Sequence, residues 1–235
     1  MIDKCTEFVQ RWLYPPCCVL CGRPGSGGRD LCAGCYGDLP WVRGACTRCA
    51  RPLHCAADRL CGRCTRMPPP FAATIAPLRY RSPVDHLILG AKFGGRLQLT
   101  RLLGELLAEA AGMCELPRPE ALLPVPLHPQ RQRVRGYNQA VELARPVSRT
   151  LGLPLLTGAC RRVRATASQT RLDGRARRAN LRGAFAVTGA LGCAHVAIVD
   201  DVMTTGSTVA ALAQALVGAG VRRVDVWCVA RADGG

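Results

Sequence analysis

Two adjacent carboxylates, Asp200 and Asp201, follow an apolar run and precede a loop of small hydroxyl residues. The apolar residues 196–199 predict a buried strand of a parallel sheet. Ligands bind at the carboxyl ends of such strands, where the aspartates can accept hydrogen bonds from two sugar hydroxyls. Loop amides and hydroxyls, at a helix expected to start near Ser207, can hold a phosphate. The segment therefore predicts a site for a phosphorylated pentose. The loop residues are Thr204, Thr205, Gly206, Ser207 and Thr208.

The same segment also has a purely structural interpretation, a buried strand followed by a helix that Ser207 or Thr208 caps. That interpretation explains the hydroxyls but not the two carboxylates before them. Residues 196–208 resemble the motif of type I phosphoribosyltransferases that binds 5-phosphoribosyl 1-pyrophosphate (PRPP). The resemblance implies that PRPP binds with Mg²⁺, that Asp200 and Asp201 are the catalytic residues, and that the loop holds the ribose phosphate. A Walker loop is excluded because no lysine follows Gly206.

Four Cys-x-x-Cys knuckles lie in the first 64 residues. Two knuckles complete a tetrahedral Cys₄ zinc site, so four knuckles predict two structural zinc ions and a double zinc ribbon. Short spacers favour pairing of sequential knuckles, whereas a cross-brace would interleave them. Cys17 and His54 are possible substitute ligands. The knuckles are Cys18/Cys21, Cys32/Cys35, Cys46/Cys49 and Cys61/Cys64.

Disulfide bonds are the alternative use of these cysteines, and they require an oxidising compartment. Residues 1–14 carry scattered charges and no apolar region typical of a signal peptide. No later run reaches the roughly 18 apolar residues of a membrane-spanning helix. The sequence therefore predicts a cytoplasmic, metal-binding protein without membrane insertion.

The rest of the chain alternates between strand and helix patterns, which predicts an α/β fold with a mostly parallel sheet flanked by helices. The prolines at 68–70 separate the two parts. We therefore expect a zinc ribbon over 1–66, a Pro-rich linker over 67–73 and a phosphoribosyltransferase-like domain over 74–235. Pro146 predicts a kink or an early end of its helix. Strands are expected at 74–80, 122–127, 155–162, 194–199 and 223–230, and helices at 83–93, 97–112, 138–151 and 207–219.

Two further basic segments suggest anion binding. The first follows the strand at 122–127 and resembles a pyrophosphate loop, because arginine grips phosphate oxygens bidentately; a solvated basic turn is the alternative. The second, residues 160–185, holds eight arginines and one acid and is expected to be a flexible loop that closes over PRPP. With a net charge of +16, the same arginines could instead bind nucleic-acid phosphates. The residues concerned are Pro126, Leu127, His128, Arg131 and Arg135 in the first segment, and Gln169, Arg177, Arg178 and Asn180 in the second.

Taken together, the knuckles, the segments 92–96, 124–128 and 135–139, and the run 200–208 resemble the ComF family over nearly the whole chain. The resemblance implies a type I phosphoribosyltransferase fold behind a double zinc ribbon, a cytosolic location and a link to DNA uptake in natural transformation. It leaves two functions open. One is a phosphoribosyltransferase with an unknown acceptor, and the other is an inactive PRPP-sensing module that binds single-stranded DNA and acts with DNA-uptake or recombination proteins. A hood over the site would come from residues 81–100 or from the ribbon.

Overall fold

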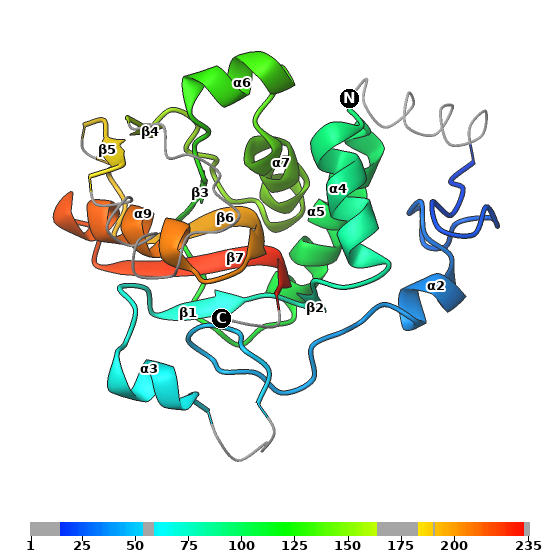
Figure 1. Ribbon diagram of the computed structural model, residues 1–235, viewed down its shortest axis with the longest axis horizontal. Coiled ribbons are helices and arrows are strands. Elements are labelled where there is room, and N and C mark those ends of the chain that lie inside the picture. Colours follow the sequence, from blue (N-terminus) through cyan, green and yellow to red (C-terminus); the bar gives the residue numbers. More distant parts are fainter. Residues whose placement is uncertain (1–14, 54–58, 164–182, 190, 233–235) are drawn as a thin grey trace.

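The computed structural model describes residues 15–53, 59–163, 183–189 and 191–232 of the chain. A five-stranded sheet lies at its centre, and all of its paired strands run parallel. The strand order is β1-β7-β6-β3, and β2 also pairs with β7. The expected α/β class with a mostly parallel sheet is confirmed (Figure 1). The strands are β1 (Ala73–Ile75), β2 (Leu78–Arg79), β3 (Ala121–Pro124), β6 (His195–Met203) and β7 (Arg223–Arg231).

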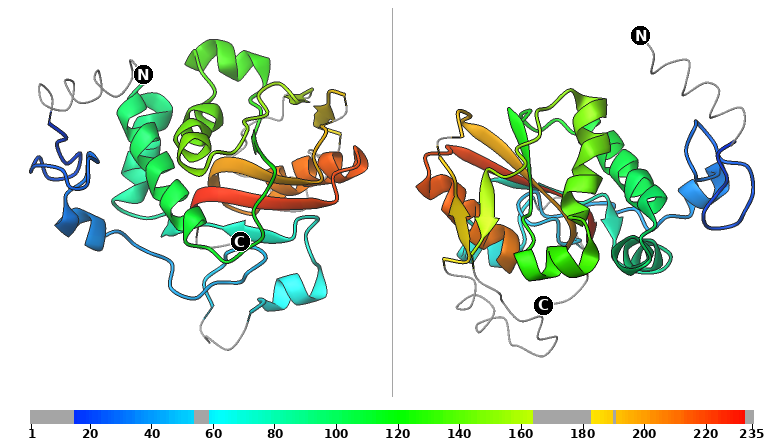
Figure 2. Two further views of the ribbon diagram at one scale, coloured as in Figure 1. Left: turned by 180° about the vertical axis from the view of Figure 1, so that it is seen from behind. Right: turned by 90° about the horizontal axis from the view of Figure 1, so that it is seen from above.

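Helices cover both faces of this sheet because side chains of the central strands alternate between two apolar cores. Ala197 and Val199 of β6 belong to one core, and Val196 and Ile198 belong to the other. Leucines of α4, α5 and α7 fill the first core, while leucines of α9 fill the second. The two helical layers are visible in Figure 1 and Figure 2. Their bounds are α4 (Val84–Phe93), α5 (Leu97–Gly112), α7 (Gln139–Leu151) and α9 (Ser207–Gly218).

The Cys-rich segment, with its short helices α2 (Ala33–Gly37) and α3 (Gly62–Arg66), packs against the sheet domain at separate places. Near α2, the Tyr36 hydroxyl donates to Glu109 of α5 at 3.0 Å. Further along, the amide of Thr74 in β1 donates to the Thr47 carbonyl at 3.0 Å. These contacts place the second half of the ribbon on the edge of the sheet. Strand β1 begins at Ala73, one residue before the expected start of that strand at residue 74.

Prolines explain two differences from the expected elements. The strand expected over 74–80 is interrupted by Pro77, which has no amide to donate and whose carbonyl accepts from Val42 at 2.8 Å. The early helix end expected at Pro146 is wrong, because α7 continues to Leu151. The Pro146 ring lies against Gly104 of α5, where a β-carbon would come within 2.4 Å of it. Contact between the two helices therefore accommodates the proline.

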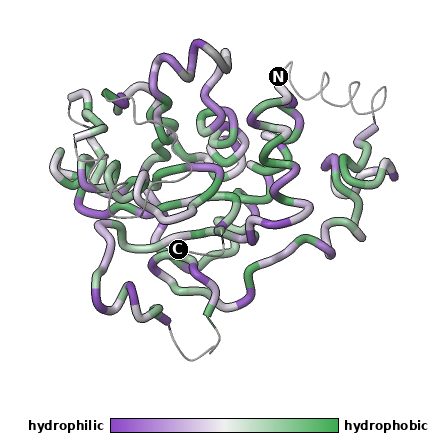
Figure 3. The backbone as a smooth tube through the Cα atoms, viewed as in Figure 1, coloured by the Kyte–Doolittle hydropathy of each residue, from purple (hydrophilic) through white to green (hydrophobic). Residues whose placement is uncertain are grey.

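Two elements were not expected in their observed form. Residues expected to form a loop after β3 instead form helix α6 (Pro129–Arg135). The helix is mostly hydrophilic (Figure 3), so its sequence has no apolar period from which a helix could be predicted. The strand expected over 155–162 is reduced to β4 (Cys160–Arg162), which pairs antiparallel with β5 (Phe185–Val187) outside the main sheet. The structure describes no helix that is both long and apolar enough to cross a membrane.

Candidate functional site

Strand β6 carries the two aspartates at its carboxyl end. It continues to Met203, beyond the end expected at residue 199, because it pairs with β7 along its full length. Adjacent strand residues point to opposite faces, so Asp200 and Asp201 diverge. Each carboxylate accepts a backbone amide, Asp200 from Asp201 at 2.9 Å and Asp201 from Val202 at 2.7 Å. These bonds fix both carboxylates at the sheet edge where ligands of parallel sheets bind.

Lys92, in the last turn of α4, forms an ion pair with Asp201 at 2.8 Å. Tyr137 supports this end of α4, because its hydroxyl donates to the carbonyl of Ala91. The sequence indicated Lys92 only as part of a family resemblance, and it gave no sign of the aspartate partner. The contact adds an ammonium group to the site, where it is paired with Asp201.

The loop of residues 204–208, called the phosphate loop below, leads directly into α9. The helix begins at Ser207, as expected. Its N-cap is Gly206, at φ +77°, and no side chain makes a capping hydrogen bond there, so the alternative of a Ser207 or Thr208 cap is wrong. Thr205 Oγ1 lies 2.8 Å from Ser207 Oγ and accepts the Ser207 amide at 3.3 Å. Helix amides and two hydroxyls therefore gather at one turn, as binding of an anion requires.

Arg231, the last residue of β7, holds this turn through hydrogen bonds to backbone carbonyls. Its role was not predicted from the sequence. Its side chain is buried, and it donates to the carbonyls of Met203 at 2.8 Å, of Thr204, and of Ala232 at 2.7 Å. Its Nε donates to the carbonyl of Cys49 at 3.0 Å. A single guanidinium thus connects the phosphate loop to the Cys-rich segment.

Burial and the charge of Asp201 raise the pKa of Asp200 to about 7, although the Asp201 amide, Lys92 and Arg162 oppose the shift. Asp200 therefore titrates near neutral pH in the ligand-free protein. Because its pKa lies above the ordinary 3.8, the folded state binds more protons than the unfolded state between about pH 4 and 7. Asp200 thus lowers stability progressively as the pH rises through this window.

We expect Asp200→Asn to remove this pH-dependent loss of stability, since the side-chain amide of asparagine is neutral at every pH. Its melting temperature should match that of the wild type at about pH 4 and below, exceed it increasingly up to about pH 7, and differ by a constant amount at higher pH. Thermal unfolding of both proteins across this range measures the difference. Asp38→Asn, at an exposed position, is the matched control and should follow the wild-type profile. A difference that does not grow with pH would contradict the assignment.

The eight knuckle cysteines form two clusters. The first cluster is Cys18, Cys21, Cys32 and Cys35, and the second is Cys46, Cys49, Cys61 and Cys64; within each, the sulfur atoms lie within 4.8 Å of one another. Sequential pairing of the knuckles is therefore confirmed. Sulfur separations of 3.6 Å for Cys21–Cys32 and 3.7 Å for Cys49–Cys61 match the edge of about 3.8 Å in a tetrahedron with Zn–S bonds of about 2.3 Å. Both clusters suit structural zinc. His54, the possible substitute ligand, lies outside the described residues.

Purified protein is accordingly expected to contain two zinc ions per chain. Each cluster supplies four thiolates to a segment with little apolar core of its own. Elemental analysis of reduced, folded protein gives the stoichiometry. A value near zero would refute zinc binding, and a value near one would show that one cluster does not retain metal.

The expected pyrophosphate segment lies beside the aspartates. Residues 126–128 follow β3, and the Val125 amide donates to the Val199 carbonyl of β6 at 2.9 Å, one residue before Asp200. Arg131 and Arg135 belong to α6 rather than to a loop, which corrects the expected backbone but leaves their role a prediction. His128 is the N-cap of that helix, and its Nδ1 accepts a hydrogen bond from the backbone amide of Gln130 at 3.4 Å. The flexible-loop residues Gln169, Arg177, Arg178 and Asn180 lie outside the described residues.

Comparison with known proteins gives two kinds of match. Residues 9–65 match the double zinc ribbon domain. The chain is also 36% identical over 222 residues to the DNA utilization protein YhgH of Escherichia coli (strain K12), covering 92% of this chain and 97% of that protein. It is 35% identical over 226 residues to Competence protein F of Haemophilus influenzae, covering 92% of this chain and 96% of that protein. The similarity thus spans both the ribbon and the sheet domain.

Proposed function

This chain belongs to the ComF family. We propose that it binds Mg²⁺-PRPP at the carboxyl end of β6 and that it acts in the cytoplasm to support DNA uptake. The names of its relatives, DNA utilization protein and Competence protein F, support the DNA-related part. The PRPP part depends on one observation. Two carboxylates and the start of α9, whose N-cap Gly206 has no capping side chain, lie in one continuous segment at the ligand-binding edge of a parallel sheet.

In this proposal the ribose of PRPP lies over Asp200 and Asp201, which accept hydrogen bonds from its hydroxyls. Its 5′-phosphate lies on the phosphate loop, where the first amides of α9 donate to it. The pyrophosphate faces residues 126–128 and the arginines of α6. Lys92 then moves from Asp201 toward the added negative charge.

The proposed reaction is phosphoribosyl transfer, in which a nucleophile displaces pyrophosphate from the anomeric carbon of PRPP. Mg²⁺ bound with the substrate would supply charge that offsets the departing pyrophosphate. The residues of this chain contribute positioning and electrostatic stabilisation rather than covalent chemistry. The acceptor is left open by this assignment.

Isothermal titration of the wild-type protein with PRPP, with and without Mg²⁺, tests the binding step. Pyrophosphate release, measured with candidate acceptors in the presence and absence of oligonucleotide, tests the transfer step. Saturable, Mg²⁺-dependent binding supports the site. Binding without any pyrophosphate release would favour the alternative of an inactive PRPP-sensing module.

That alternative includes binding of single-stranded DNA, which the net charge of +16 favours. DNA would lie along the arginines of residues 131–135 and 161–182. Few aromatic side chains accompany these arginines, so we expect an affinity that depends little on base sequence and falls steeply with salt. Fluorescence anisotropy across a salt series measures this dependence. Replacing Arg175, Arg177 and Arg178 together by Ala should weaken binding and leave zinc content unchanged; an unaltered affinity would place DNA elsewhere.

A further inference from the structure

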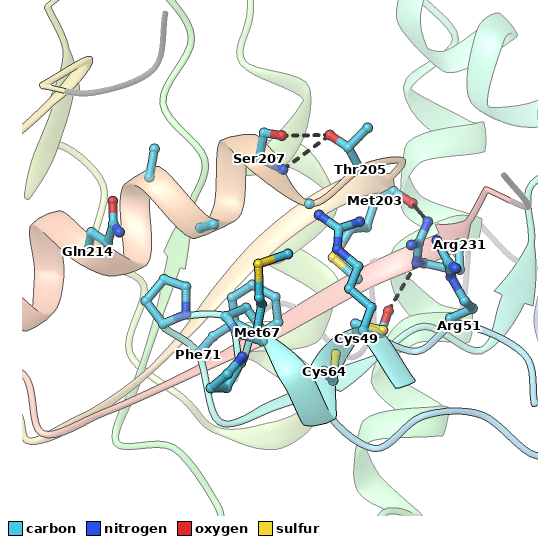
Figure 4. A pocket seen from close by; sticks show the side chains of 17 residues that line it. Cys49, Arg51, Cys64, Met67, Phe71, Met203, Thr205, Ser207, Gln214 and Arg231 are labelled. Atoms are coloured by element: carbon cyan, nitrogen blue, oxygen red, sulfur yellow. Dashed lines mark hydrogen bonds between the residues drawn. The ribbon is translucent and has the colours of Figure 1, made fainter. Parts of the chain in front are cut away.

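A cavity of about 280 Å³ lies between α9, the second cluster and the proline-rich segment 67–70 (Figure 4). One wall is a single face of α9, formed by Ser207, Ala210, Ala211 and Gln214. Thr205 and Gly206 extend this wall into the phosphate loop. Neither aspartate of the proposed PRPP site lines the cavity. It therefore shares the phosphate loop with that site but not the two aspartates.

Three arginine side chains bring positive charge to the cavity, beside the thiolates of Cys49 and Cys64. Arg51, Arg63 and Arg231 line it, and no acidic side chain does. Arg231 donates to backbone carbonyls, and Arg51 and Arg63 belong to the ribbon side of the cavity. Guanidinium groups in this arrangement favour a phosphate, which they can bind bidentately.

The remaining wall is apolar and partly open to water. Pro68, Pro69 and Pro70 form it with Met67, whose side chain is 62% exposed. An exposed thioether beside proline rings offers a flat, adaptable surface for an apolar group. A ligand that suits the whole cavity therefore combines a phosphate with a flat, largely apolar body.

We propose that this cavity binds a nucleotide, with its phosphate toward Arg51 and Arg63 and its base against Met67 and the prolines. Its volume is near the lower limit for small-molecule sites, which suits one nucleotide. The nucleotide can be free or one unit of a nucleic-acid strand. The proposal does not require PRPP binding, because Arg51, Arg63 and Met67 lie outside the proposed PRPP site; the cavity and that site share Thr205, Gly206 and Ser207.

A different role for the two arginines is to offset the thiolate charge of the second cluster, since Cys49 and Cys64 also line the cavity. In that case their removal would lower zinc retention and leave nucleotide binding unchanged. The two roles are therefore separable by measuring zinc content and nucleotide affinity on the same protein.

The test is calorimetric titration of zinc-loaded full-length protein with adenosine 5′-monophosphate and with a short 5′-phosphorylated oligonucleotide. We expect Arg51→Gln/Arg63→Gln to weaken binding of whichever probe saturates the wild type by at least about tenfold. Ala211→Phe, which fills the cavity from α9 and keeps every charge, should weaken it similarly. Arg145→Gln/Arg149→Gln removes the same charge from α7 and should leave the affinity unchanged.

Saturation by the mononucleotide identifies a free nucleotide as the ligand, and saturation by the oligonucleotide alone identifies a strand. The proposal is overturned if neither probe binds the wild type, or if Ala211→Phe binds with unaltered affinity. It is also overturned if Asp200→Ala/Asp201→Ala abolishes binding while Arg51→Gln/Arg63→Gln does not, because the nucleotide would then occupy the proposed PRPP site. PRPP titration of the same variants reports separately on that site.

Discussion

Replacing Asp200 and Asp201 together by alanine is expected to abolish measurable binding of Mg²⁺-PRPP. The two carboxylates are the proposed acceptors for the ribose hydroxyls, and hydrogen bonds to charged groups contribute about 1.5–3 kcal/mol each. Their joint loss corresponds to a decrease in affinity of roughly a hundredfold or more. The variant should remain folded, because it removes a buried carboxylate and its repulsion with the neighbouring one, the two causes that raise the pKa of Asp200.

Isothermal titration of wild type and double variant under identical conditions provides the measurement. Glu105→Ala/Glu142→Ala is the matched control, since it removes two carboxylates from surface ion pairs on α5 and α7. Its affinity should equal that of the wild type. Equal affinity of the aspartate variant and the wild type would exclude the 200–208 segment as the PRPP site.

Loss of zinc from the second cluster is expected to weaken PRPP binding far more than loss of zinc from the first. The reason is the Arg231 side chain, which joins the Cys49 carbonyl to those of Met203 and Thr204. Without zinc, the segment around Cys49 loses its fixed position, and the phosphate loop loses one side of its support. The first cluster packs instead near Glu109 of α5, on a different part of the domain.

The pair of variants Cys46→Ser/Cys61→Ser and Cys18→Ser/Cys32→Ser tests this asymmetry, each removing two ligands from one cluster. Zinc content should fall by about one ion in both. We expect a loss of PRPP affinity of at least about tenfold only for the variant of the second cluster. Hydrogen exchange of the amides of residues 203–208 should accelerate in that variant even without PRPP. Equal effects of the two variants would show that the Arg231 contact does not couple the ribbon to the loop.

The chemical groups of this protein could be predicted from the sequence because they lie in short, continuous segments. The knuckle spacing identified the eight ligands and favoured sequential pairing, because short spacers close locally, and the structure confirms that pairing. Likewise the run 196–208 encodes strand, carboxylates and phosphate loop in order. The alternation of strand and helix patterns was sufficient for the α/β class, because strands buried on both faces of the sheet appear as continuous apolar runs.

Tertiary structure alone decided how these groups are supported. Arg231 meets Cys49 across 182 residues of sequence, and Lys92 meets Asp201 from a different element, so no local pattern could reveal either contact. The same holds for Pro146, whose close contact with α5 depends on a glycine in that helix. Helix α6 was missed because a mostly hydrophilic helix has no apolar period to recognise. Local sequence determines which groups a segment offers, whereas their partners follow from packing between segments that are distant along the chain.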